Sequence, residues 1–564
     1  MHNNKPYIYQ IFTRLFGNKQ EEMTFNGSRE ENGTGKFDDI TQKALEGIKE
    51  LGITHVWYTG VIEHALVQGY PEHGIPDGNP MVIKGKAGSP YAIKDYYDVN
   101  PDLAVDVSKR MSEFEALVER THDSGMKVII DFVPNHLARV YHSDVKPEGV
   151  KDFGEDDNAA KAFDPQNNFY YIPGEKLILP EELHQQFPGV LYEEFPAKAT
   201  GNDQFTHQPG INDWYETVKL NYGVDYQNDH QKHFDPTPDT WKKMEHILKY
   251  WAGKGVDGFR CDMAEMVPVE FWEWVIKRVK ADYPEIIFIA EIYNPDAYSE
   301  YIHRGGFDYL YDKVGLYDTL KGVMRGEQPA SDITGCWQSL QGNDACMLRF
   351  LENHDEQRIA SRFFAGDPWK AIPAMLVSAT MNKGPAMLYF GQEVGEPAEG
   401  ASGFSGDDGR TTIFDYWRVP EHQKWMNNGN FDGGKLSKDQ QTLRDKYREI
   451  GEIAQEEAIV NGDFYDLMYF NEDNPQFDSQ KIYAYLRYTG NQKLLFVANF
   501  SGEERQIRVK IPSHAFEMMG MGKTSGVSLK KLGGDEFHAD LGVEKVVEII
   551  VEGLDYDILE IQNI

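Results

Sequence analysis

The sequence predicts an α/β fold: a (β/α)8 barrel of the TIM type with an irregular inserted subdomain and a C-terminal all-β sandwich. Strand and helix patterns alternate along most of the chain, an irregular stretch interrupts them after the third strand, and the tail contains only short strand patterns. The predicted domains are the first part of the barrel (1–136), the insert (137–221), the second part of the barrel (222–460) and the sandwich (461–564).

The first part of the barrel alternates apolar strand runs with helical spacing of apolar residues. In order, the strands and helices are expected at 7–12, 40–51, 54–58, 108–124 and 127–131. The stretch from the second strand to about residue 97 carries several Gly and Pro residues and is expected to be a loop. Such alternation favours a parallel sheet with crossover helices.

The insert is expected from about 137 to 221, where Gly, Pro, Asp and aromatic residues mix without a helical period. So long an irregular stretch is a subdomain rather than a loop. Regular patterns then return as helix 240–252, a strand ending at Asp262, helix 271–283, a strand ending at Glu291, strands 307–311, 346–351 and 386–390, and helix 443–458. These strands bring the expected count to eight.

The C-terminal tail changes character after about residue 463. The runs 481–486, 494–498 and 507–511 are short, β-branched or aromatic, and separated by polar turns. This pattern is typical of an antiparallel sandwich.

Composition narrows the function classes. The 564 residues carry 91 acidic and 57 basic side chains, a formal net charge of −34. Nucleic acid and anionic membranes are therefore poor partners, and a neutral or cationic ligand fits better. The three cysteines, Cys261, Cys336 and Cys346, are too few and too scattered for a disulfide framework and are expected to be free thiols.

The N-terminal segment passes directly into a core strand pattern, with no charged-then-apolar leader ahead of it. No apolar run approaches the length that spans a bilayer. We expect a cytoplasmic protein; a secreted or periplasmic location would require a leader that has been removed.

Three predicted strands end in a carboxylate. In the run 256–262, Arg260 and Asp262 are two residues apart and point to the same strand face. Glu291 follows a second apolar run, and Asp355 follows a third. Because a parallel barrel gathers the C-terminal ends of its strands on one face, we expect these carboxylates to converge on one pocket.

Four motifs at these strand ends carry a family resemblance. Residues 131–136 read Asp-Phe-Val-Pro-Asn-His, 258–262 read Gly-Phe-Arg-Cys-Asp, 290–291 read Ala-Glu, and 353–355 read Asn-His-Asp. In this order, with an insert after the third strand and an all-β tail, the chain resembles the α-amylase family, glycoside hydrolase family 13. The resemblance covers essentially the whole chain.

The chemistry of that family explains the residue types. Retaining cleavage of a glycosidic bond needs one carboxylate as nucleophile and one protonated acid, about 5–5.5 Å apart. Asp262, beside Arg260, is expected to be ionised and to act as nucleophile. Glu291 ends an apolar strand, where burial is expected to raise its pKa and keep it protonated as general acid, and later as base.

By resemblance, Asp355 holds sugar hydroxyls and helps distort the ring, His136 and His354 bond hydroxyls of the same sugar, and Tyr91 stacks on it. Each residue taken singly also has a structural explanation. An Asp after a barrel strand is often a helix cap, and a Tyr in a chain this rich in Tyr is often a packing residue. Cys261 points to the opposite strand face and is expected to be a core thiol.

The resemblance implies no cofactor for the chemistry but raises the question of Ca²⁺. Asn135 matches a calcium ligand of many members, whereas 263–266 read Met-Ala-Glu-Met where many amylases have a Lys-His pair whose His carbonyl also helps bind calcium. Two interpretations stay open: Asn135 contributes to one Ca²⁺ between barrel and insert, or the acidic loops there are merely solvated.

Residues 217–221 read Thr-Val-Lys-Leu-Asn and match the Met-Pro-Lys-Leu-Asn signature of the neopullulanase and cyclomaltodextrinase branch at three of five positions. Relatives in that branch usually have an extra N-terminal β domain, whereas this chain begins directly on the barrel. The partial match favours α-glucan or maltodextrin substrates over sucrose or trehalose. Residues 403–410, a Gly-rich loop after the eighth strand, are placed to line the cleft.

We therefore expect a retaining glycoside hydrolase that cleaves mainly α-1,4 bonds in starch-derived glucans or maltodextrins. Two alternatives share the scaffold: a glucanotransferase or maltosyltransferase that uses the same covalent intermediate, and a non-catalytic carbohydrate-binding protein. An inverting mechanism is a further alternative. Chain length, endo or exo attack, α-1,4 or α-1,6 preference and oligomeric state do not follow from the sequence.

Overall fold

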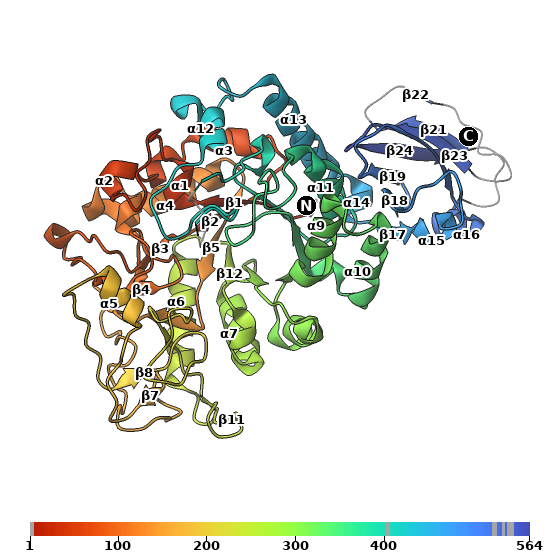
Figure 1. Cartoon of the computed structure of the whole chain (residues 1–564). Coiled ribbons are helices and arrows are strands. Elements are labelled where there is room, and N and C mark those ends of the chain that lie inside the picture. The colour runs from red at the N-terminus through yellow and green to blue at the C-terminus, as the bar shows by residue number, and fades with distance from the viewer. Residues whose placement is uncertain (1–4, 401–405, 522–526, 533–535, 538–545, 564) are drawn as a thin grey trace.

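The computed structural model describes residues 5–400, 406–521, 527–532, 536–537 and 546–563. Its centre is a closed barrel of parallel strands in the order β1-β16-β15-β14-β13-β12-β5-β2. Figure 1 labels β1, β2, β5 and β12 of this barrel. The strands are β1 (Tyr7–Phe12), β2 (His55–Thr59), β5 (Lys127–Phe132), β12 (Gly258–Cys261), β13 (Ile287–Ala290), β14 (Tyr309–Tyr311), β15 (Met347–Phe350) and β16 (Ala386–Tyr389). All eight predicted strands are confirmed as barrel strands.

The barrel strands read as nearly continuous apolar runs because both of their faces are buried. One set of side chains fills the interior, with Ile8, Trp57, Ile129, Ile289, Leu348 and Met387 among them. In β12, Arg260 lies level with Ile289 of β13 and Asp131 of β5, so it belongs to this inward-facing row. The sequence thus places a guanidinium inside the barrel, near the end where the strands finish.

Helices surround the barrel and pack their apolar faces on it. The longer ones are α3 (Gln42–Lys49), α4 (Arg110–Asp123), α6 (Asp239–Gly253), α7 (Val269–Asp282), α9 (Asp318–Arg325), α11 (Ala371–Thr380) and α13 (Lys438–Ile453). Every residue of α11 is buried, because this helix lies between the barrel and the C-terminal domain. Within the described ranges, no helix has the length and apolar composition of a membrane-spanning segment.

The polypeptide between β5 and α6 forms the irregular region at the lower left of Figure 1. Its elements are β6 (His136–Ala138), β7 (Tyr171–Ile172), α5 (Glu181–Gln186), β8 (Ala197–Lys198), β9 (Thr217–Lys219), β10 (Val224–Asp225) and β11 (Gln231–Lys232). Strand β6 pairs with β9, which sets His136 opposite Lys219. This pairing joins the beginning of the inserted region to a segment near its end, beside the barrel mouth.

The stretch expected to be a loop up to residue 97 contains a hairpin. Strand β3 (Ile62–His64) pairs with β4 (Ile93–Val99). All seven residues of β4 are buried although three of them are charged. Lys94 pairs with Glu63 at 2.8 Å, Asp98 pairs with Arg110, and Asp95 accepts hydrogen bonds from main-chain N–H groups. These buried charges break the apolar alternation by which a strand is recognised.

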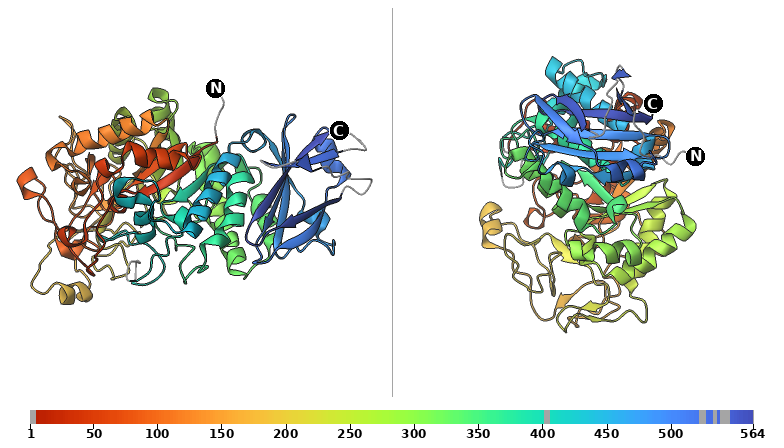
Figure 2. Two further views of the ribbon diagram at one scale, coloured as in Figure 1. Left: turned by 90° about the horizontal axis from the view of Figure 1, so that it is seen from above. Right: turned by 90° about the vertical axis from the view of Figure 1, so that its right-hand side faces the viewer.

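The C-terminal domain is the predicted antiparallel sandwich, and it lies at one end of the molecule (Figure 2). One sheet has the order β17-β18-β19-β24-β21-β22, and β20 pairs with β23. The bounds are β17 (Asp463–Asp466), β18 (Ile482–Tyr488), β19 (Lys493–Asn499), β20 (Arg505–Lys510), β21 (Val527–Lys531), β22 (Glu536–Phe537), β23 (Val546–Val551) and β24 (Tyr556–Asn563).

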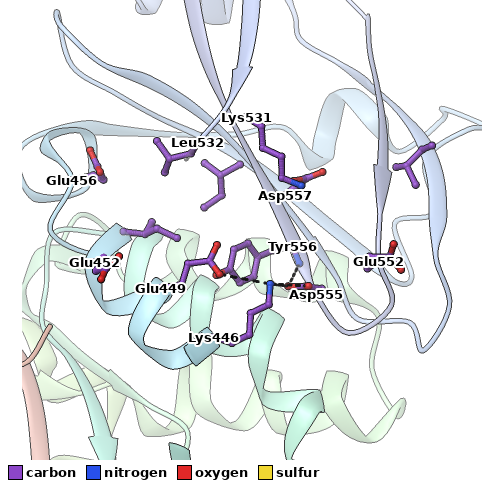
Figure 3. A pocket seen from close by; sticks show the side chains of 13 residues that line it. Lys446, Glu449, Glu452, Glu456, Lys531, Leu532, Glu552, Asp555, Tyr556 and Asp557 are labelled. Atoms are coloured by element: carbon purple, nitrogen blue, oxygen red, sulfur yellow. Dashed lines mark hydrogen bonds and ion pairs between the residues drawn. The ribbon is translucent and has the colours of Figure 1, made fainter. Parts of the chain in front are cut away.

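Part of the seam between the domains is polar. Figure 3 shows a cavity of about 390 Å³ between α13 and the C-terminal strands, with Lys446 of α13 reaching Asp555 at 2.9 Å. Acidic side chains of both domains, including Glu449 and Glu552, surround it. Ion pairs that are open to water contribute little to stability, so domain attachment must depend mainly on contacts elsewhere in the seam.

One such contact is a buried arginine of β18. Arg487 is 1% exposed and donates hydrogen bonds to the carbonyl oxygens of Ala458 (3.2 Å), Met381 (2.9 Å), Ile459 (2.8 Å) and Gly462 (2.8 Å). Met381 follows α11 of the barrel, and the other three carbonyls lie in or next to α14 (Glu457–Val460), where the barrel domain ends. Arg487 therefore joins the sandwich to the barrel through main-chain acceptors.

We expect Arg487→Met to lower the free energy of unfolding by at least about 3 kcal/mol, because each buried carbonyl left without a donor costs about 1–3 kcal/mol. Guanidinium chloride unfolding followed by circular dichroism measures this. The control is Arg505→Met in the same domain, whose side chain is 37% exposed, and it should change stability by no more than about 0.5 kcal/mol. Equal effects of the two substitutions would contradict the role of Arg487.

Candidate active site

Arg260 lies at the centre of the site. It is fully buried, and its terminal nitrogens lie 2.7 Å from Asp262 Oδ1 and 2.9 Å from Glu291 Oε2. Its Nε donates to the Tyr311 hydroxyl at 3.0 Å, and Asp131 lies 3.5 Å from the guanidinium. One positive charge thus connects the carboxylates that end two neighbouring strands.

Strand register explains why these carboxylates meet. Cys261 is the last residue of β12 and lies level with Ala290, the last residue of β13. Asp262 and Glu291 are the next residues and therefore leave the barrel at the same height. The Glu291 carboxylate also accepts hydrogen bonds from the Met263 N–H at 2.8 Å and the Tyr293 hydroxyl at 2.6 Å.

The pKa of Asp262 shifts in the direction opposite to the one that its neighbour Arg260 led us to expect. Burial first, and the negative charge of Glu291 second, raise the pKa of Asp262 well above its ordinary value, and Arg260 opposes them. The guanidinium that Asp262 shares with Glu291 does not offset the burial of the Asp262 carboxylate.

Asp355 and His354 form the opposite side of the site. His354 Nε2 lies 3.1 Å from Asp355 Oδ2, and Gln10 donates to His354 Nδ1 at 2.8 Å, so we infer that Nε2 carries the ring proton. Burial acts to raise the Asp355 pKa, but His354, Arg260 and Arg410 outweigh it and lower the pKa. Asp355 is 32% exposed, against 8% for Asp262, so it faces open space.

Tyr91 and His136 complete the group of predicted residues. The Tyr91 hydroxyl contacts His354 Nε2 and Asp131 Oδ1, and its ring lies 5.3 Å from the His354 ring. His136 is buried against Trp214, with ring centroids 5.2 Å apart. Burial, followed by the charges of Lys219 and Lys84, lowers the pKa of His136 to about 3. The imidazole is therefore neutral at ordinary pH and serves as a hydrogen-bonding group.

Asn135 lies next to His136, where its surroundings do not fit a dication. Its Oδ1 accepts a hydrogen bond from the Lys219 ammonium, which also lies 2.8 Å from Asp203 Oδ1 and 3.3 Å from the Met266 carbonyl oxygen. Lys219 is 1% exposed. An amide oxygen, a carboxylate and a carbonyl are ligands that Ca²⁺ prefers, but here they surround an ammonium group.

A second acidic group lies in the β3–β4 hairpin. Carboxylate oxygens of Glu63, Asp95 and Asp98 lie within 4.8 Å of one another. Lys94 pairs with Glu63 at 2.8 Å, and Arg110 Nε donates to Asp98 at 2.7 Å. Cations of the chain already neutralise two of the three carboxylates, so the group is a structural ion network.

Several residues of the site were missed by sequence reasoning. Tyr293 bonds Glu291, Tyr311 bonds Arg260, and Asp131, the first residue of the 131–136 motif, lies 3.5 Å from Arg260. Of the Gly-rich loop 403–410, residues 403–405 lie outside the described residues. Arg410 lies close enough to Asp355 to lower its pKa. Tyr293 lies two residues after Glu291, the expected catalytic acid. This spacing was the one sequence feature that could have indicated it.

The family model described as alpha amylase, catalytic domain, matches residues 10–458. Alpha-amylase 3 of Dictyoglomus thermophilum is 22% identical over 485 residues, covering 81% of this chain and 80% of that protein. The chain spans 55% of the length of a second alpha-amylase from the same organism. Trehalose-6-phosphate hydrolase of Bacillus subtilis is 21% identical over 587 residues, covering 89% of this chain and 90% of that protein.

Solved structures show the same fold. The alpha-amylase of Geobacillus thermoleovorans, complexed with acarbose, superposes with a TM-score of 0.63 at 18% identity, covering 99% of this chain and 98% of that one. A maltogenic alpha-amylase of Thermotoga neapolitana gives 0.60 at 20% identity, covering 99% of both chains. With the family model matching most of the chain, this protein belongs to the alpha-amylase family and is a glycosidase of that type.

Proposed function

We propose that the protein is a retaining α-glucan hydrolase acting mainly on α-1,4 bonds, with Asp262 as nucleophile, Glu291 as general acid and base, and Asp355 as the third carboxylate. The observation that carries this proposal is that Arg260 contacts both Asp262 and Glu291, at 2.7 and 2.9 Å. Two carboxyl groups on one guanidinium favour the short separation of about 5–5.5 Å used for retention over the about 6.5–9.5 Å used for inversion.

In the first step, an Asp262 oxygen bonds to C1 of the sugar while the bond from C1 to the glycosidic oxygen breaks. Glu291 gives its proton to that oxygen, and the leaving chain departs as an alcohol. In the second step, Glu291 takes a proton from water, the water oxygen bonds to C1, and the bond to Asp262 breaks. Two inversions at C1 leave its configuration unchanged.

The other predicted residues bind the reacting sugar. Asp355, the most exposed of the three carboxylates, accepts hydrogen bonds from sugar hydroxyls that strengthen as positive charge develops at C1. His136, neutral and buried, and His354, whose Nε2 faces Asp355, bond further hydroxyls of that sugar. Tyr91 offers its ring to the sugar, and its hydroxyl is anchored on Asp131 and His354.

The proposed chemistry requires no cofactor, because every proton and electron pair it moves belongs to side chains, substrate or water. Calcium is not proposed at Asn135, because Lys219 fills that position.

The substrate class follows the partial Met-Pro-Lys-Leu-Asn match and agrees with the maltogenic alpha-amylase among similar folds.

The test is product analysis with maltotriose, soluble starch, cyclodextrin and pullulan. Proton NMR during the first minutes should show the α-anomer of the new reducing end; the β-anomer would refute retention. Glucanotransferase activity is the second candidate, because water and a sugar compete for one intermediate. Products longer than the starting maltooligosaccharide, formed faster than free reducing ends, would assign the protein to that class.

The raised pKa of Asp262 gives an expectation for pH dependence. A nucleophile must be ionised, so kcat/KM should rise with pH through a pKa above the ordinary value of about 3.9 for Asp. The acidic limb for maltotriose hydrolysis should therefore lie above pH ~4, as measured by initial rates between pH 3 and 9 at constant ionic strength. A rate that stays on its plateau down to about pH 4 would contradict a raised pKa.

A further inference from the structure

Glu291, the proposed general acid, meets different groups on its two carboxylate oxygens. Oε2 accepts a hydrogen bond from the Met263 N–H at 2.8 Å and lies 2.9 Å from a terminal nitrogen of Arg260. Oε1 accepts a hydrogen bond from the Tyr293 hydroxyl at 2.6 Å. A proton on Oε2 would face the N–H groups of Met263 and Arg260, which are donors themselves. The proton that Glu291 delivers as an acid therefore belongs on Oε1, the oxygen that Tyr293 contacts.

Tyr293 follows β13 at the barrel mouth and reaches Glu291 from there. Its side chain is partly exposed, whereas Glu291 is 3% exposed. Burial first, and then the charges of Glu291 and Asp355, raise the pKa of the Tyr293 hydroxyl. The hydroxyl therefore keeps its proton and remains a donor throughout the pH range of an ordinary assay.

The main chain of Tyr293 is held by a carboxylate from the neighbouring segment. Glu265 Oε2 accepts from the Tyr293 N–H at 3.2 Å and from the Asn294 N–H at 3.1 Å. Glu265 lies in the segment that follows β12, and the Ala264 N–H of this segment donates to the Glu291 carbonyl oxygen at 3.1 Å. The segments after β12 and β13 are thus joined by hydrogen bonds around Glu291.

Met263 has a backbone conformation that is unusual for its residue type. Its φ and ψ are both 43°, in the left-handed region that residues other than glycine rarely adopt. In this conformation its N–H donates to Glu291 Oε2. Such a conformation persists only where the surrounding structure holds it, as the hydrogen bonds of Ala264 and Glu265 do here. The chain after Asp262 is therefore shaped around the Glu291 carboxylate.

The hydrogen bond from Tyr293 gains strength during the first step of the reaction. An oxygen that carries a proton is a weak acceptor. As that proton moves to the glycosidic oxygen, negative charge develops on Oε1 and the bond from the Tyr293 hydroxyl becomes charge-assisted. Its length of 2.6 Å lies within the about 2.5–2.7 Å typical of such bonds. An interaction that is stronger in the transition state than in the bound substrate accelerates the reaction.

We propose, on the basis of the proposed function, that Tyr293 is a positioning residue for the general acid. It fixes the proton-bearing oxygen of Glu291 and stabilises the carboxylate as the proton leaves, and Glu265 holds Tyr293 in place through its main chain. Tyr293 itself transfers no proton to or from the substrate. Its contribution is therefore largest when the leaving group needs a proton, and it disappears when the leaving group needs none.

The experiment compares three α-maltotriosides that differ in the leaving group: phenyl, 4-nitrophenyl and fluoride. Phenoxide depends most on the general acid, 4-nitrophenoxide depends on it less, and fluoride leaves without it. For Tyr293→Phe, we expect kcat/KM to fall at least about tenfold on the phenyl substrate, less on the 4-nitrophenyl substrate, and no more than about twofold on the fluoride. Unchanged turnover of the fluoride also shows that the variant is folded.

Tyr298→Phe is the matched control. Tyr298 is buried in the same segment, and its hydroxyl has no hydrogen-bond partner among the residues that the structure describes. Its loss should leave kcat/KM within about twofold on all three substrates. Glu265→Ala should reproduce the dependence on the leaving group, because it releases the Tyr293 main chain. Glu265→Gln keeps an acceptor oxygen and should restore most of the lost activity.

Equal losses on the three substrates in Tyr293→Phe would show that its hydroxyl serves folding or substrate binding, and no loss on any of them would show that Glu291 acts without it. Either outcome overturns the inference and leaves the hydrolase proposal intact. Wild-type rates in Glu265→Ala would overturn the role of Glu265. If the wild type turned over neither these substrates nor starch, the hydrolase proposal itself would be refuted.

Discussion

Replacing Asp262 with Asn should lower kcat on maltooligosaccharides by about 10⁴-fold or more, the scale seen when a nucleophile is removed. The amide is nearly isosteric and can still lie beside Arg260, so the KM or Kd for the oligosaccharide should change little. Initial rates on maltotriose and calorimetric binding of a slow substrate measure the two quantities. A variant that retains wild-type turnover would show that the nucleophile lies elsewhere.

The variant Glu291→Gln distinguishes the role of Glu291 from that of Asp262. A fluoride leaving group needs no proton, so this variant should still be glycosylated by α-maltotriosyl fluoride, whereas Asp262→Asn should not. Without a base for the second step, the covalent adduct should accumulate on Glu291→Gln and appear by mass spectrometry. Asp257→Asn is the control. That carboxylate lies at the other end of β12, where it accepts from the Val128 N–H at 2.8 Å, and its loss should leave kcat within about twofold.

The barrel could be predicted because its strands are buried on both faces, and this leaves an apolar run for every strand. The positions of Asp262 and Glu291 follow almost from chain order, since both come directly after strands that are in register. The hairpin of β4 could not be found in this way, because its buried charges are satisfied by residues distant in the chain, such as Asp144 for Lys94 at 2.7 Å. Long-range pairing leaves no local pattern.

The same reason limits the prediction of electrostatics. Strand-face geometry correctly put Arg260 beside Asp262, and from that pair alone an ionised Asp is the natural expectation. The pKa of Asp262 is raised because its carboxylate is buried and because Glu291 shares the same guanidinium. Neither fact is visible until β12 and β13 are placed side by side. Tyr293 and Lys219 contact the site for equally non-local reasons.

Lys219 gives the second large expected effect. Lys219→Ala should lower the free energy of unfolding by at least about 2 kcal/mol, because the Asn135 amide oxygen and the Asp203 carboxylate both lose a buried donor. The region inserted after β5 should loosen at the barrel mouth, where β9 pairs with β6 beside His136. Denaturant unfolding measures the loss. Lys232→Ala is the control: its pair with Glu270 is half exposed, and its loss should cost less than about 1 kcal/mol.

The effect of Ca²⁺ and EDTA on the Tm distinguishes the role of Lys219 in this ion pair from ordinary packing. In the wild type, neither EDTA nor millimolar CaCl₂ should change the Tm, because the ammonium group fills the space between Asn135 and Asp203. In Lys219→Ala, the amide oxygen, the carboxylate and the Met266 carbonyl are left facing one another, a set of ligands suited to Ca²⁺. Calcium should therefore raise the Tm of the variant alone, and EDTA should reverse the change. A wild-type Tm that falls in EDTA, or a variant indifferent to calcium, would show that Lys219 does not stand in the place of a metal ion.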